Sequence, residues 1–169
     1  MTPSLSLHLH TVRWACALAC AAALVGCAVP EWQKPGTPAS QIQKDMGSPQ
    51  VRSPLPEGGE RWVYSRQPMG QQVYHFDFDS AKHLLSVRQV LEASEFNRLR
   101  PGVDTRDSVY QVFGKPAMVE HVASFKGDIW TYRIYENGSD RQAHVFLDPQ
   151  YVVQRVMFTD ERHRDDDRH

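Results

Sequence analysis

Residues 100–132 read RPGVDTRDSVYQVFGKPAMVEHVASFKGDIWTY, and this stretch decides the predicted fold. Three apolar side chains in its first half recur at helical spacing: Val109, Val112 and Phe113. Asp104 is suited to cap the start of such a helix, and Gly114 is suited to end it. We therefore predict a short helix with one buried face.

The residues after this helix predict a three-stranded antiparallel meander. The expected strands cover residues 128–135, 142–147 and 152–158, with turn-forming residues between them. Trp130 and Tyr132 share one face of the first strand, because side chains alternate along a strand. The helix can cover that face, and residues 92–99 are expected to form a short helical connection before it.

The same order of signals occurs twice, at an offset of roughly 67 residues, which indicates an internal duplication. The first pass contains Lys34-Pro35-Gly36, Gly47-Ser48-Pro49 and Trp62-Val63-Tyr64, and the second contains Arg100-Pro101-Gly102, Gly114-Lys115-Pro116 and Trp130-Thr131-Tyr132. In the first pass, strands are expected at residues 61–65, 73–78 and 84–91. The predicted fold class is α+β: two tandem repeats of short helices packed on a three-stranded antiparallel meander.

The N-terminal segment has the layout of an export signal. Arg13 is its one Lys or Arg residue, and the apolar run that follows is shorter than the ~20 residues that span a bilayer. The run ends in four residues that match the lipobox of bacterial lipoproteins: Leu24, Val25, Gly26 and Cys27. We therefore expect cleavage before Cys27 and attachment of a lipid to its thiol, with membrane binding through that anchor.

These signals divide the chain into five expected segments. They are a lipoprotein signal peptide at 1–26, a lipidated extended tether at 27–38, a first repeat at 39–91, a second repeat at 92–159 and a disordered charged tail at 160–169. Cys16 and Cys20 lie in the signal peptide, so the mature chain has no internal disulfide. The formal net charge of −1 gives no basic field for nucleic acid.

The second repeat resembles a known family. Residues 96–102, Phe113-Gly114-Lys115-Pro116, Trp130-Thr131-Tyr132 and Phe146-Leu147-Asp148 are similar to the SmpA/OmlA family of BamE-like lipoproteins. The resemblance implies outer-membrane anchoring, no catalysis and binding to components of the β-barrel assembly machinery. Ala28 after the lipobox cysteine is, by resemblance, typical of outer-membrane sorting. Tandem copies also resemble the β-lactamase inhibitory protein, which binds protein surfaces with its sheet.

The aromatic residues common to both repeats have two interpretations. Trp62, Tyr64, Trp130 and Tyr132 could be interface anchors, but their repetition favours a core role. Tyr110 lies beside the apolar stripe of the predicted helix and is our candidate for a surface contact.

Polar clusters give little support for a catalytic or metal site. His75, Asp77 and Asp79 share one strand face, and a solvent-facing polar edge explains them better than a metal site does. The charged tail with His163 and His169 is explained by solvation. The sequence contains no Gly-x-Ser-x-Gly elbow and no phosphate-binding loop, so we predict no enzyme, cofactor or metal.

The leading functional hypothesis is an outer-membrane-anchored, periplasm-facing lipoprotein that serves as a scaffold or binding module. Its expected partner is a periplasmic or outer-membrane protein, and outer-membrane protein assembly or envelope integrity is the expected process. The alternative is a periplasmic inhibitor or sensor that binds an enzyme or a cell-wall fragment. A hydrolase is a third hypothesis, which a His-by-His scan would test.

Overall fold

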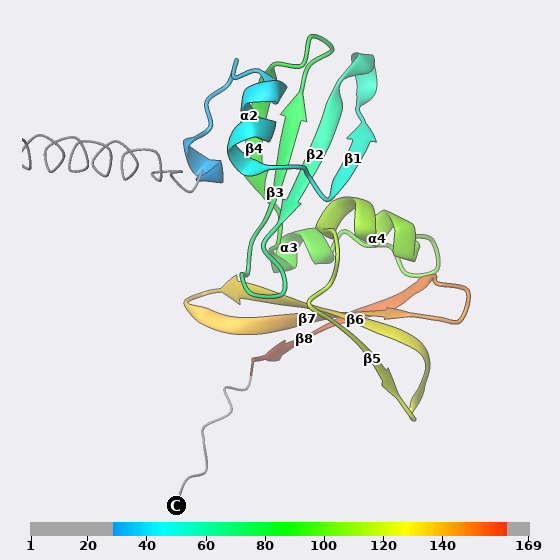
Figure 1. Ribbon diagram of the computed structural model, residues 1–169. Coiled ribbons are helices and arrows are strands. Elements are labelled where there is room, and N and C mark those ends of the chain that lie inside the picture. The colour runs from blue at the N-terminus through cyan, green and yellow to red at the C-terminus, as the bar shows by residue number, and fades with distance from the viewer. Residues whose placement is uncertain (1–28, 162–169) are drawn as a thin grey trace, which may run out of the picture.

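The computed structural model of the protein describes residues 29–161. This part is mostly β, with two four-stranded antiparallel sheets and a few short helices (Figure 1). The predicted fold class, α+β with helices on three-stranded meanders, is therefore wrong. Each sheet has an additional first strand whose side chains show no regular buried alternation.

The first sheet has the order β1-β2-β3-β4. Its strands are β1 (Val51–Pro54), β2 (Glu60–Ser65), β3 (Val73–Phe78) and β4 (Leu84–Gln89), with the one-turn helix η2 (Pro56–Gly58) between β1 and β2. Helix α2 (Ala39–Met46) covers one face, where Ile42 is buried. The apolar cluster below it contains Trp62, Tyr74, Phe76, Phe78 and Leu84.

The second sheet has the order β5-β6-β7-β8. Its strands are β5 (Met118–Val122), β6 (Phe125–Glu136), β7 (Ser139–Leu147) and β8 (Val153–Asp160). The helices α3 (Ala93–Phe96) and α4 (Arg106–Phe113) lie between the two sheets (Figure 1). They cover one face of the second sheet and leave its other face without a helix.

One continuous core joins both sheets through α4. Val109 and Phe113 of this helix are fully buried, and the ring centroids of Phe96 and Phe113 stack 4.0 Å apart. The same core takes Val51, Val63 and Val73 from the first sheet and Trp130, Tyr132, Ile134 and Val145 from the second. An eight-residue helix buries little by itself, so α4 gains its stability by packing on two sheets.

The start of α4 differs by one residue from the predicted cap. Thr105 is the N-cap and forms a capping box with Ser108, whereas the Asp104 carboxylate accepts hydrogen bonds from the backbone N–H and guanidinium of Arg100. Gly114 ends the helix with φ 68°, in the left-handed region that favours glycine.

The same local hydrogen bonds occur beside both helices. The Tyr64 hydroxyl donates to the Gly47 carbonyl at 2.9 Å, and the Tyr132 hydroxyl donates to the Gly114 carbonyl at 2.9 Å. The backbone N–H of Gly36 donates to the Leu84 carbonyl at 2.7 Å, as that of Gly102 does to Val153 at 2.8 Å. These pairs are consistent with a duplication, which remains a prediction.

The loop between β2 and β3 joins the first sheet to the second. The Gln67 side-chain amide lies against the backbone of Arg133 on β6: its Nε2 donates to the Arg133 carbonyl at 2.7 Å, and its Oε1 accepts from the Arg133 N–H at 3.2 Å. Because β5 pairs only with an earlier part of β6, Gln67 satisfies strand groups that β5 leaves open.

Candidate protein-binding face

The second sheet has a face that no helix or strand covers in the described part of the chain (Figure 1). We call it the outer face. Side chains directly opposite each other in antiparallel strands share a face, so the register assigns its members. The outer face contains Met118, Glu120, Ile129, Thr131, His144, Phe146, Arg155 and Met157.

One row of this face crosses all four strands. Thr131 and His144 occupy its centre, and Met118 and Met157 lie at its two ends. The two methionines are 46% and 44% exposed, and three strand spacings place them roughly 14 Å apart. Flexible thioether side chains adapt to different apolar surfaces, so the row presents two adjustable contacts around a fixed centre.

The centre of the row is a chain of hydrogen bonds. The Thr131 hydroxyl donates to the Glu120 carboxylate at 2.7 Å, and its oxygen lies 2.9 Å from Nδ1 of His144. Nε2 of His144 lies 2.8 Å from the Thr159 hydroxyl. The Thr131 hydroxyl donates its hydrogen bond to Glu120, so its oxygen must accept from an N–H at Nδ1 of His144. Nε2 of His144 then accepts a hydrogen bond from the Thr159 hydroxyl.

Burial lowers the pKa of His144, and this supports the neutral ring that the hydrogen bonds require. Thr131 is fully buried although the face has no cover, because its neighbours surround it. The polar groups at the centre are therefore satisfied within the sheet.

In the neighbouring row, two apolar side chains lie beneath a cationic one. Ile129 and Phe146 are buried, and the guanidinium of Arg155 lies 4.2 Å from the centroid of the Phe146 ring. Phe125 packs edge-on against the same ring at 5.1 Å. A long arginine side chain is a movable cover, so a partner that displaced it would reach the aromatic surface below.

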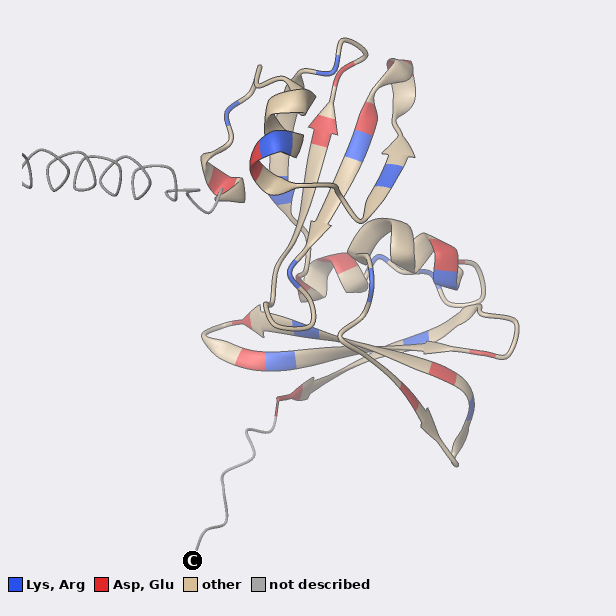
Figure 2. Cartoon of the chain, viewed as in Figure 1, with Lys and Arg blue, Asp and Glu red and all other residues tan. Residues whose placement is uncertain are grey.

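Charges of both signs are interspersed over the two sheets (Figure 2). On the outer face itself, Glu120 and Arg155 have opposite charges. A face with exposed methionines, a shielded aromatic ring and balanced charge is suited to another protein surface.

The predicted lipid site lies outside the described residues. This applies to Cys27 and to the other lipobox residues Leu24, Val25 and Gly26. Tyr110, our candidate surface contact, is partly buried and packs against the core of α4. The core interpretation is confirmed for Trp62, Trp130 and Tyr132, which are buried, while Tyr64 is partly buried.

The strand with His75 corrects one expectation. His75 is 2% exposed, because α4 covers it and the Val112 carbonyl lies 2.6 Å from its Nε2. Asp77 pairs with Arg61 through two hydrogen bonds. The predicted solvent-facing polar edge is therefore wrong for His75. Among residues 29–161, no group of three or more His, Cys, Asp or Glu side chains is placed to hold a metal ion.

Sequence reasoning missed the outer face. Thr131 and His144 alternate with core residues, which was a usable signal, but Met118 belongs to a strand that was not predicted.

No helix of the described residues is long and apolar enough to cross a bilayer.

The second half of the chain is similar to a known family. Residues 89–164 match the family model described as the outer membrane protein assembly factor BamE domain. The matched segment contains the second sheet and the helices α3 and α4. Every residue of the outer face lies within this segment, whereas the first sheet lies almost entirely before it. No curated protein matches the chain.

Two solved structures show a weak likeness. One is a DUF4309 family protein (YjgB) from Bacillus subtilis subsp. subtilis str. 168, at TM-score 0.31 and 15% identity, covering 74% of this chain and 79% of that one. The other is a cysteine-rich secretory protein (SAV1118) from Staphylococcus aureus subsp. aureus Mu50, at TM-score 0.29 and 15% identity, covering 75% of this chain and 44% of that one. Neither likeness carries an argument about fold or function.

Proposed function

We propose that this protein is a lipid-anchored, non-catalytic accessory factor of outer-membrane protein assembly that faces the periplasm. The BamE domain supports the process, because that domain is described as an outer membrane protein assembly factor. The lipobox ending at Cys27 supports the anchor. In this proposal the protein acts by binding: acylation confines it to the membrane surface and raises its effective concentration toward membrane-bound partners.

The observation that carries the proposal is the outer face of the BamE domain. Met118 and Met157 remain in solvent at the two ends of a row whose centre is polar and satisfied. Methionine is enriched at protein interfaces, and its flexible side chain adapts to different partner surfaces. We therefore assign the outer face to a protein subunit of the β-barrel assembly machinery.

Affinity purification tests this assignment. The double variant Met118→Glu/Met157→Glu places two charges on the outer face at exposed positions, so the fold is retained. We expect it to recover several-fold less of the assembly subunits than the wild type does. Val103→Glu is the matched control, because Val103 is 58% exposed and lies in the loop before α4. Equal recovery by the wild type and the double variant would contradict the proposal.

The anchor has its own test. Cys27→Ala removes the thiol that would be acylated, so we expect an unprocessed precursor and a large loss of tightly bound protein from the membrane fraction. Intact mass of the wild-type protein should show cleavage before Cys27 and added acyl groups. An unmodified mature N-terminus would refute the lipid anchor while leaving the binding face open to its separate test.

A further inference from the structure

Residues 29–38 do not extend away from the body but pack on the first sheet; we call them the leash. The one-turn helix η1 (Pro30–Trp32) lies near its start, and Pro30 is buried. The Tyr74 hydroxyl of β3 donates a hydrogen bond to the Glu31 carboxylate. That bond is the largest cause of the lowered pKa of Glu31.

The end of the leash is joined to the same sheet through its backbone. Gly36 N–H donates to the Leu84 carbonyl at 2.7 Å, and Leu84 N–H donates to the Thr37 carbonyl at 2.9 Å. Pro38 forms a β-bridge with His83. The leash is thus fixed at both of its ends.

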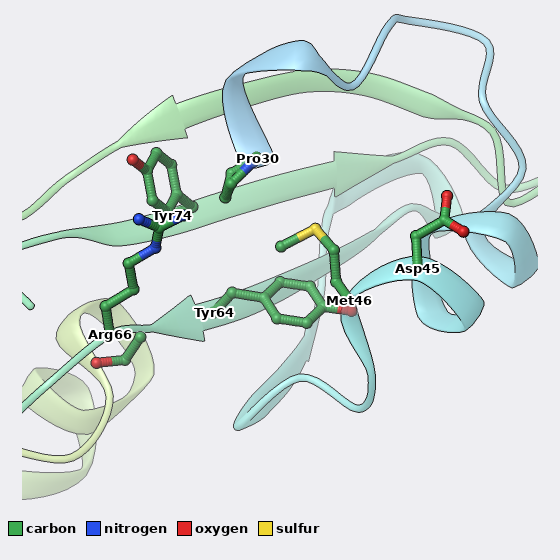
Figure 3. A pocket seen from close by; sticks show the side chains of 7 residues that line it. Pro30, Asp45, Met46, Tyr64, Arg66 and Tyr74 are labelled. Atoms are coloured by element: carbon green, nitrogen blue, oxygen red, sulfur yellow. The ribbon is translucent and has the colours of Figure 1, made fainter. Parts of the chain in front are cut away.

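Side chains of α2 and the leash face each other across a hollow of about 300 Å³. Figure 3 shows Met46 of α2 beside Pro30, with the Tyr64 ring next to Met46 and Arg66 reaching toward Tyr74. The guanidinium of Arg66 lies 5.8 Å from the centroid of the Tyr74 ring. The leash therefore lines one side of this hollow through Pro30.

The fixed leash limits the distance between the body and the anchor. Three residues of fully extended chain reach about 11 Å, so Pro30 lies no farther than that from Cys27. The headgroup layer of a leaflet is roughly 5–7 Å thick. If Cys27 is acylated, as the proposed function holds, the side of the first sheet that carries α2 must lie close to the bilayer surface.

Two exposed apolar side chains lie where the membrane would then be. Trp32 of η1 is 76% exposed, whereas Trp62 and Trp130 are buried. Leu85 of β4 is 56% exposed and lines a second hollow together with Glu31 and Pro35 of the leash. Tryptophan is enriched at the level of the lipid headgroups, because its ring is apolar and its N–H is polar.

We propose that the leash holds the first sheet directly against the bilayer, with Trp32 in the headgroup layer. The occupant of this surface is a phospholipid membrane, and the body of the protein does not swing on a flexible spacer. The inference rests on the proposed acylation of Cys27.

Fluorescence quenching in vesicles tests the inference. The lipidated full-length mature protein is incorporated into phosphatidylethanolamine and phosphatidylglycerol vesicles that contain a phospholipid with a nitroxide on its headgroup. Trp32→Phe, measured in parallel, isolates the signal of Trp32 from those of the two buried tryptophans. We expect the nitroxide to quench the Trp32 fluorescence strongly. Aqueous iodide should quench it several-fold less than it quenches a tryptophan that is fully exposed to solvent.

The matched control is a variant with ten Gly and Ser residues inserted between Ala28 and Val29. Such a linker adds an average reach of about 18 Å without changing the anchor or the folded body. Nitroxide quenching of Trp32 should fall several-fold in this variant. Equally weak quenching in both proteins would overturn the inference.

Intact mass and vesicle flotation separate this inference from the anchor proposal. If the wild-type protein carries acyl groups and floats with the vesicles, but Trp32 remains open to iodide, only the leash inference fails. If Cys27 carries no lipid, both proposals fail.

Discussion

Tyr132 shows how one buried hydroxyl fixes the end of a helix. Its side chain is fully buried, and its hydroxyl donates to the Gly114 carbonyl where α4 ends. Tyr132→Phe leaves that carbonyl without its partner, so we expect a loss of about 1–2 kcal/mol in the free energy of unfolding. Urea denaturation measures it.

Tyr64 is the matched control within the same chain. It makes the corresponding bond to the Gly47 carbonyl but is only partly buried, so water can replace the hydroxyl. Tyr64→Phe should therefore cost less than Tyr132→Phe. The account of these bonds is mistaken if the two variants lose equal stability.

His75 makes stability depend on pH. Burial lowers its pKa below the ordinary value of about 6.5, and the same holds for His144. The unfolded chain then binds more protons than the folded one as pH falls through that value, so the free energy of unfolding falls below about pH 6.5.

The variant His75→Gln isolates this contribution. Urea denaturation at pH 7.5 and at pH 5.5 should show a smaller decrease for His75→Gln than for the wild type. A decrease that is unchanged by the substitution would show that other groups cause the pH dependence.

At the scale of elements, the loop between β2 and β3 holds the two sheets together through Gln67. Its amide makes two hydrogen bonds to the Arg133 backbone of β6. Gln67→Ala should destabilise the fold by about 1–2 kcal/mol and speed hydrogen exchange of the Arg133 amide. Exchange at Ile134, which pairs with β7, serves as the control, and unchanged exchange at Arg133 would contradict the assigned contact.

Most strands could be predicted because runs of β-branched and aromatic residues lie between turn-forming residues, but β1 and β5 could not. β1 has four residues and ends at Pro54, and most side chains of β5 remain exposed. Both strands form through backbone pairing with a neighbour that lies later in the chain. Periodicity records burial and not pairing, so it gives no signal for such edge strands.

At the scale of the whole molecule, the shared core makes the two sheets interdependent. Phe113 of α4 is fully buried within it. Phe113→Ala should cost about 3–5 kcal/mol and lower the stability of both sheets together. Denaturation followed separately through Trp62 in the first sheet and Trp130 in the second should give coincident transitions. Separate midpoints would show that the sheets unfold independently.

The position of α4 between the sheets could not be predicted from its sequence. Its apolar stripe predicts one buried face, but Val112 and its carbonyl also contact the first sheet through His75. The outer face was likewise hidden, because Thr131 is a buried polar residue on an uncovered side. The resemblance of the second half to the BamE family could be recognised from the sequence. Its motif residues lie at the end of α4 and in the buried part of the second sheet.

The central proposal is that the outer face, which lies in the segment similar to the BamE domain, binds a protein of the outer-membrane assembly machinery. Photocrosslinking in cells tests it most directly, with a photoreactive amino acid at Met157 and, as the control, at Val103. The account predicts that the probe at Met157 forms an adduct with a subunit of that machinery and that the probe at Val103 does not. An adduct at Val103 alone, or none at Met157 in lipidated, folded protein, would contradict it.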